Sequence, residues 1–317
     1  MTDERKALPV APLNVTGDSK HERLKCVMDE LEQGVKAVFT SANFYNYLKF
    51  LAKFHSYSAN NCILIAMQKP DATLVAGYGD WLKKHHRYVR KGEKAIKILA
   101  PTPYKKKTEK EVVDEHGNKS KEEVEVLVPA FKIVNVFDVS QTEGEPLPDL
   151  GMPDVTTEND VDGYDDFMSA LHAISPFPIG FENIPGETQG YCHQVERRIA
   201  IQEDMSQLYT LKTTIHEIAH AVLHAWPEDG KKPKDGPNRS TKEVQAESVA
   251  FVICRHYGLD TCDYSFTYIA GWSSGREVKE LKASLEVIRS TAHDLITAID
   301  AALDKTETGV TENALAR

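Results

Sequence analysis

The chain has 317 residues, of which 41% are hydrophobic and 27% are charged, and its formal net charge is −10. This length suggests two domains more readily than one and is ample for a sizeable hydrophobic core. The composition is that of an ordinary globular protein, and no apolar run approaches the roughly 20 residues that span a bilayer, so we expect no membrane partner.

Charged residues are divided unevenly along the chain. Residues 1–150 contain 23 Lys and Arg against 21 Asp and Glu, whereas residues 151–317 contain 15 against 27. A charge step of this kind favours two domains with different partners. Composition and turn residues predict these segments: a disordered leader at 1–18, a first domain at 19–140, a linker at 141–160, a second domain at 161–305 and a disordered tail at 306–317.

The five cysteines are scattered and never have the Cys-x-x-Cys spacing. Neither a disulfide framework nor a cysteine-based zinc site is therefore expected, and a reducing cytoplasm is the natural location. The N-terminal segment mixes acids and bases and lacks an apolar stretch, so we expect no secretory signal there.

The first half predicts helices followed by strands. Apolar residues recur at helical spacing from about residue 19 to 55, and a capped, buried helix follows over 57–67. A strand is predicted at 95–101. It precedes a long strand pair, roughly 103–113 and 122–137, with a charged hairpin tip around 116–118.

The second half predicts a helix near 162–174, a strand at 191–202 and then three more helices. The first of these is expected to begin after Asp204, with Gln207 completing a capping box, and to end near Ala225 before Pro227. The others are expected at about 241–257 and 276–304. The whole pattern predicts an α+β protein.

One short run carries the clearest chemistry of the sequence, His216-Glu217-Ile218-Ala219-His220. Helical residues four apart lie on one face, about 6 Å apart along the axis, so two imidazoles can share one ion. Glu217 is rotated by about 100° from His216, which predicts a general base rather than a ligand. The run is typical of zinc enzymes that hydrolyse peptide or amide bonds. The alternative is an amphipathic helix that carries surface histidines by chance.

A third ligand is sought on the helix at 241–257, because a catalytic zinc ion keeps three protein ligands. Glu243 and Glu247 lie one turn apart, so only one of them is expected to reach the ion. We favour Glu247, because small residues flank it and permit close helix approach; Glu243 is the alternative. His224 lies roughly 12 Å along the axis from His216, too far to share its metal. Three residues are candidates for stabilising an oxyanion: Tyr191, Tyr264 and Tyr268.

Residues 78–97 interleave tyrosine and tryptophan with seven Lys and Arg residues. Basic side chains that neutralise phosphates, next to aromatic rings on which nucleobases stack, are typical of single-stranded nucleic-acid binders. The alternative is a solvated charged face over ordinary core aromatics, and composition alone does not separate the two.

An ordered series of short strings raises the odds of the first interpretation. The strings are Phe54-His55-Ser56-Tyr57-Ser58-Ala59-Asn60-Asn61, then Trp81, then Val89-Arg90-Lys91-Gly92-Glu93-Lys94, and later Val136-Phe137-Asp138-Val139-Ser140-Gln141. In this order the sequence resembles the N-terminal domain of ArdC-type antirestriction proteins. With the histidine run it is also similar to LtrC-like proteins of conjugative elements and to the ImmA/IrrE peptidase group. The resemblance covers about residues 20–260, and the hairpin at 103–123 looks like an insertion.

The resemblance implies an N-terminal domain that binds single-stranded DNA and a C-terminal zincin-like metallopeptidase domain. On this view His216, His220 and Glu247 bind Zn²⁺ and Glu217 is catalytic. The predicted nucleic-acid-binding residues are Tyr57, Ser58, Asn61, Trp81, Arg87, Arg90, Lys91 and Lys94.

Two functions follow from these interpretations. The first is a DNA-associated zinc metallopeptidase of a plasmid or mobile element, with a protein substrate and a role in antirestriction or in protecting incoming DNA. The second is a non-proteolytic, DNA-binding antirestriction factor whose zinc site is structural or vestigial. A third, weaker idea is that the acidic second half occupies a basic protein surface.

Overall fold

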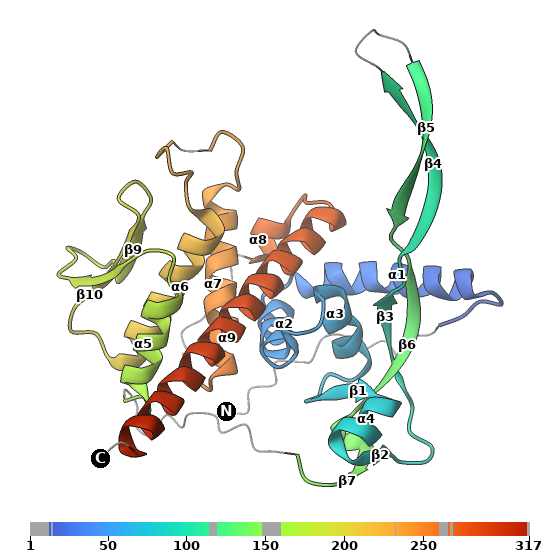
Figure 1. The fold of residues 1–317 in the computed structure, drawn as a ribbon, viewed down its shortest axis with the longest axis horizontal. Coiled ribbons are helices and arrows are strands. Elements are labelled where there is room, and N and C mark those ends of the chain that lie inside the picture. The colour runs from blue at the N-terminus through green and yellow to red at the C-terminus, as the bar shows by residue number, and fades with distance from the viewer. Residues whose placement is uncertain are drawn as a thin grey trace.

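The computed structural model describes residue 13 and residues 15–113, 119–147, 160–231, 233–259, 266 and 269–315. Helices and short sheets are mixed along the chain, as the sequence predicts (Figure 1). Most of the predicted leader, the hairpin tip and most of the predicted linker lie outside the described residues.

Three helices open the chain: α1 (Lys20–Val38), α2 (Ser41–Phe54) and α3 (Ala59–Gln68). The side chain of Ser19 accepts a hydrogen bond from the backbone of Glu22, whose carboxylate accepts one in return, so a capping box begins α1. Ser58 caps α3 by accepting a hydrogen bond from the Asn61 N–H. Almost every residue of α3 is buried, which agrees with the helix predicted from its apolar sequence.

A three-stranded antiparallel sheet packs beside α3, in the order β1 (Val75–Gly77), β6 (Phe131–Asp138), β3 (Ile96–Pro101). A smaller unit lies below it in Figure 1: α4 (Tyr78–His85), with β2 (Arg87–Val89) paired to β7 (Thr142–Gly144). Between β6 and β7, a single 3-10 turn, η1 (Val139–Gln141), is capped by Asp138.

A long antiparallel hairpin, β4 (Tyr104–Val113) with β5 (Lys119–Val128), extends away from the rest of the molecule (Figure 1). The strand predicted over 122–137 is therefore two strands, β5 and β6, which belong to different sheets. The reason is Pro129, which cannot donate to a ladder and interrupts the run.

The second half begins with α5 (Tyr164–Ile174) and a small sheet in the order β8 (Ile179–Glu182), β10 (Arg198–Gln202), β9 (Gly190–His193). The strand predicted at 191–202 is in fact a hairpin of β9 and β10, with Arg197 at a positive φ of 52° in its turn. The helix α6 (Gln207–His224) follows. Its N-cap is Ser206 rather than the predicted Asp204, which has a left-handed φ of 59°.

Three further helices complete the fold: α7 (Arg239–His256), α8 (Ile269–Ser273) and α9 (Val278–Leu315). The helix α9 runs past residue 304, into the segment predicted as a tail, and crosses the molecule diagonally in Figure 1. It packs on helices of both halves, and α2 packs on α7. One continuous hydrophobic core therefore joins the two predicted domains.

Among the described residues, none of the helices combines the length and the hydropathy that crossing a bilayer requires. None of the four cysteines in the described part (Cys26, Cys62, Cys192 and Cys254) forms a disulfide, and Cys262 lies outside it.

Candidate metal centre

The helix α6 presents the histidine run because its opposite face is buried. Leu211, Ile215 and Ile218 are at most 1% exposed, and burying each such side chain is worth roughly 1.5–3 kcal/mol. This burial fixes the rotation of α6, so that His216 and His220 emerge one turn apart from its other face.

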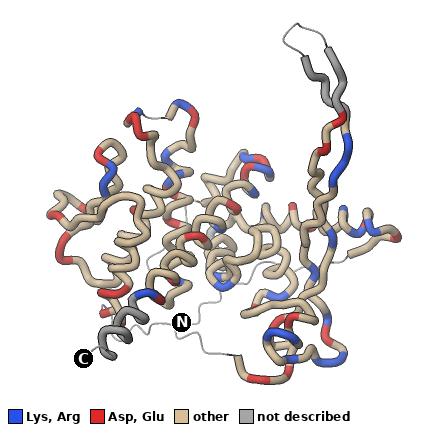
Figure 2. Tube along the Cα trace, in the orientation of Figure 1, with Lys and Arg blue, Asp and Glu red and all other residues tan. Residues whose placement is uncertain are grey.

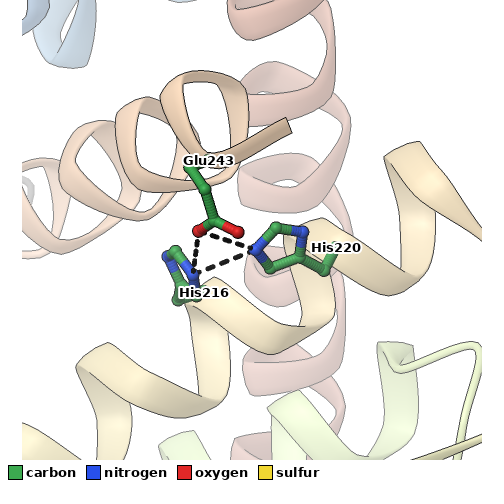
Figure 3. Close-up of side chains that lie close together, drawn as sticks. All are labelled: His216, His220 and Glu243. Carbon is green, nitrogen blue, oxygen red and sulfur yellow. Dashed lines mark hydrogen bonds and ion pairs between the residues drawn. The ribbon is translucent and has the colours of Figure 1, made fainter. Parts of the chain in front are cut away.

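The two imidazoles converge on one point. The Nε2 atoms of His216 and His220 lie 3.1 Å apart, and their ring centroids are 4.7 Å apart in an edge-on arrangement (Figure 3). Both rings are partly buried. Two nitrogen atoms that face the same space at this separation are a suitable pair of ligands for one divalent ion.

The third group comes from α7, whose N-cap Asn238 accepts a hydrogen bond from the Thr241 N–H. Glu243 stands over the two rings in Figure 3. Its Oε2 atom is 3.8 Å from His216 Nε2 and 3.5 Å from His220 Nε2. Among the described residues, these three side chains form the one group whose geometry could hold a metal ion.

Glu247 lies elsewhere, which differs from the preference for it stated above. Its Oε2 atom is 3.1 Å from Nδ1 of His216, on the opposite side of that ring from Nε2. The physical reason is the advance of about 5.4 Å per helical turn. One turn beyond Glu243, a carboxylate meets the back of the His216 ring rather than the space between the two imidazoles.

Glu217 is buried beside this group, with an exposed fraction of 6%. Burial raises the pKa of its carboxyl, while the neighbouring His216 and His220 act in the opposite direction. The backbone N–H of Cys192, on β9, also donates to this carboxylate. A carboxyl with a raised pKa that is fixed beside two imidazoles has the properties of a proton acceptor and donor.

The strand β9 runs along α6 at the edge of its sheet. A Cβ atom on Gly190 would lie 2.6 Å from Thr213 Cγ2 and 3.3 Å from Glu217 Cγ, so glycine permits this close approach. Tyr191 does not point freely into the site, since its hydroxyl donates to Glu182 and accepts from Arg198. The other two oxyanion candidates, Tyr264 and Tyr268, lie outside the described residues.

His224 is not a member of the metal-binding group. Its Nε2 atom lies 3.3 Å from the backbone carbonyl of Lys242, immediately before Glu243 in α7. Burial, with the nearby His220 and Lys242, lowers its pKa to about 4, so the ring is neutral and donates to that carbonyl.

Several residues predicted to bind nucleic acid make contacts within the protein. The Tyr57 hydroxyl donates to the Val75 carbonyl, and Ser58 is the cap of α3. Asn61 is buried, with its amide paired to both backbone groups of Leu99 at 2.9 Å, which joins α3 to β3.

The same holds for the predicted stacking and basic residues of 81–90. Trp81 is 0% exposed and its indole N–H donates to the Phe137 carbonyl at 2.8 Å. Arg87 donates to Thr142 and to backbone carbonyls of β7 and the residue after it. Arg90 pairs with Glu93 at 2.7 Å and donates to the Ser140 carbonyl.

Lys91 and Lys94 are exposed beside this unit, and their contact with phosphates stays a prediction. The exposed aromatic side chains next to them are Tyr78, at 60%, and Tyr88, at 53%. They occur in the same basic stretch as Trp81, but sequence alone does not reveal which aromatic ring is turned inward. Figure 2 shows Lys and Arg on α4 and on the loop toward β3, with acidic residues along β7.

Comparison with known proteins gives one match to a sequence family. Residues 18–137 match the family described as the N-terminal domain of anti-restriction factor ArdC. The matched residues run from just before α1 to near the end of β6, a range within which the hairpin β4–β5 lies.

Whole-chain similarities are more distant. The uncharacterized protein pXO2-81 of Bacillus anthracis is 26% identical over 326 residues, covering 90% of this chain and 52% of that protein. The chain thus spans about half the length of this curated relative. Two crystal structures of the antirestriction protein ArdC from plasmid R388 are also similar. The metal-free form has a TM-score of 0.46 and 20% identity, covering 78% of this chain and 86% of that one. The Mn(II)-bound form has a TM-score of 0.47 and 18% identity, covering 89% and 96%.

Proposed function

We propose that this chain is a metallopeptidase of the zincin type, with an N-terminal half that binds single-stranded DNA, and that it acts in antirestriction. The observation that carries the metallopeptidase part is the convergence of His216 Nε2, His220 Nε2 and Glu243 Oε2 within 3.8 Å of one another. The match of residues 18–137 to the ArdC N-terminal family supports the antirestriction part.

The donor set fits a divalent ion. Burial disfavours a charge on His216, but the carboxylates of Glu247, Glu217 and Glu243 raise the pKa of its ring, so the site attracts positive charge. Two imidazole nitrogens with one carboxylate oxygen are a ligand set used by zinc in hydrolases. We therefore propose Zn²⁺, held by His216, His220 and Glu243.

A bound divalent ion would supply Lewis acidity, which polarises a scissile carbonyl. Glu217 then serves as general base and later as proton donor, because its raised pKa brings proton exchange closer to neutral pH. Glu247 orients the His216 ring through Nδ1, as carboxylates beside metal-bound histidines do. An extended peptide could add to the edge strand β9, whose Cys192 N–H is bonded to Glu217.

The DNA-binding part rests on a revised set of residues. We assign stacking to Tyr78 and Tyr88, which are exposed, and phosphate contacts to Lys83, Lys91 and Lys94. The contacts of Trp81, Arg87 and Arg90 give those side chains a supporting role in holding this unit together.

A second candidate function is a non-proteolytic antirestriction factor that protects DNA by binding alone. It is favoured by the family match, which covers the N-terminal domain and stops before the histidine run. In this case the metal would stabilise the fold and Glu217 would have no chemical role.

The variant Glu217→Gln separates the two candidates. It keeps the shape of the side chain and leaves both imidazoles in place, so it should retain metal and DNA affinity while abolishing peptide hydrolysis. The exposed Glu187→Gln, in the loop before β9, is the matched control and should retain everything. If antirestriction in cells survives Glu217→Gln unchanged, the proteolytic function is excluded and the binding function stands.

A further inference from the structure

The first turn of α7 is held by three sets of contacts that do not involve the metal-binding side chains. Asn238 caps it by accepting the Thr241 N–H at 2.9 Å. His224 of α6 donates to the Lys242 carbonyl at 3.3 Å. The third set consists of hydrogen bonds to the Thr241 side chain from α8 and from the residues after it. Glu243 follows directly, so whatever holds this turn also positions the third candidate ligand.

The contact to Thr241 is made by a tryptophan and an arginine that act together. The Trp272 indole N–H donates to Thr241 Oγ1 at 3.0 Å, and the Arg276 guanidinium donates to the same oxygen at 3.2 Å. Arg276 also donates to the Trp272 carbonyl and lies over its ring, 4.5 Å from the centroid. The two side chains are thus fixed to each other as well as to Thr241, and all three are partly buried.

Trp272 is at the same time in contact with the N-terminal half. Its ring lies 5.8 Å from that of Phe39, which is itself 5.6 Å from Phe44 of α2. Phe44 continues this aromatic chain to Phe266, 5.2 Å away, and Phe266 contacts Phe251 of α7. The four phenylalanine rings are buried and closely packed, so a continuous row of aromatic contacts joins α2 to α7.

We propose that Trp272 is a positioning residue for the metal centre: through Thr241 it holds the start of α7 so that Glu243 meets the two imidazoles, and it ties that geometry to α2. This inference rests on the proposed metal site and adds residues with no contact to the ion. A ligand carboxylate is effective only within narrow limits of position, so its supporting contacts influence metal affinity.

The Thr241 hydroxyl is the shared acceptor of this contact. A hydroxyl oxygen can accept two hydrogen bonds, and Thr241 Oγ1 receives two donors, one of them charged. Arg276 is itself held in place, because it donates to the Trp272 carbonyl and lies over the indole ring. Through these two donors, α8 and the segment after it are hydrogen-bonded to α7 at Thr241.

The metal affinity of the full chain tests the proposal. Competition with a chromophoric chelator measures Zn²⁺ binding, and the absorption spectrum of bound Co²⁺ reports the ligand geometry. Trp272→Phe removes one donor and Thr241→Val removes the acceptor for both. We expect Trp272→Phe to weaken Zn²⁺ binding several-fold, and Thr241→Val to weaken it about 10–100-fold and to change the Co²⁺ spectrum. Thr241→Ser keeps the hydroxyl and should restore both.

The matched control is Trp81→Phe. Trp81 is also an indole donor to one acceptor, the Phe137 carbonyl, but it lies in the unit formed by α4, β2 and β7. It should lower thermal stability without changing Zn²⁺ affinity. Equal affinity in the wild type, Thr241→Val and Thr241→Ser would overturn the inference while leaving the metal site intact. A wild-type chain that binds neither Zn²⁺ nor Co²⁺ would overturn the proposed function first, and this inference with it.

Discussion

The carboxylate of Glu247 lies 3.1 Å from Nδ1 of His216, while Nε2 of the same ring faces His220 and Glu243. The two nitrogen atoms of the His216 ring therefore face two carboxylates of α7 that lie one helical turn apart. At the proposed metal site these positions would give the two carboxylates different tasks: Glu243 would complete the ligand set, and Glu247 would orient the His216 ring.

This division predicts a graded response to substitution at Glu247. Glu247→Gln should weaken Zn²⁺ binding about 10–100-fold without abolishing it, because the ring loses its charged orienting partner but keeps its ligand nitrogen. Chelator competition at constant pH measures this. Loss of all binding in Glu247→Gln would instead make Glu247 the ligand.

Exposed tyrosines should carry the DNA affinity. Tyr78→Ala and Tyr88→Ala are each expected to weaken binding of a single-stranded oligonucleotide by about 1–3 kcal/mol, the usual value for one stacked base. Fluorescence anisotropy over a range of salt concentrations measures both the loss and the number of phosphate contacts. Tyr104→Ala, at a comparably exposed ring on β4, is the control. Equal losses at all three positions would argue against a stacking surface at α4 and β2.

Asn61 should be a stability residue rather than a DNA contact. Asn61→Ala leaves the N–H and the carbonyl of Leu99 without their partner, at a cost of about 1–3 kcal/mol for each buried group left unsatisfied. Urea denaturation measures the change in the free energy of unfolding. The neighbouring Asn60→Ala should have little effect, and a stable Asn61→Ala with weakened DNA binding would restore the role predicted from sequence.

Stability should fall in mild acid because of a histidine cluster between the halves. His55, at the end of α2, has Nδ1 3.0 Å from Nδ1 of His293, and its ring is 4.8 Å from that of His256. Burial first, and then the two histidines and Arg289, lowers the pKa of His55 from 6.5 to about 4.

Between pH 6.5 and about 4, His55 binds a proton in the unfolded chain but stays neutral in the folded chain. The stabilising contribution is therefore complete above pH 6.5 and is lost as the pH falls through this window. His55→Asn should flatten the dependence of unfolding free energy on pH, whereas His172→Asn, at an exposed position of α5, should leave it unchanged. A dependence equally steep in His55→Asn would assign the effect to other groups.

The sequence predicted the features that depend on interactions between residues close together in the chain. The helix of the histidine run was predictable because its apolar spacing and its flanking residues act within a few turns, although its N-cap is Ser206 and not the predicted Asp204. Which carboxylate faces the imidazoles was not predictable, since it depends on how α6 and α7 cross. Likewise Trp81 and Tyr88 belong to one aromatic and basic stretch, and only tertiary packing buries the first and exposes the second.

The packing of the two halves against each other could not be predicted either, because it depends on contacts between residues far apart in the sequence. A charge step and an acidic, proline-containing segment predicted two domains on a linker, yet α2 packs on α7 and α9 contacts helices of both halves. Contacts such as the one from Trp272 to Thr241 join residues whose neighbours in sequence carry no motif. No spacing rule identifies such pairs.

Metal content tests the central claim most directly. The purified wild-type chain, after equilibration with Zn²⁺ and removal of free ion, should hold about one ion per chain by elemental analysis. His216→Ala, His220→Ala and Glu243→Ala should each hold none, while circular dichroism shows them folded. A metal-free wild type, or a Glu243→Ala variant that retains the ion while Glu247→Ala loses it, would contradict the site described above.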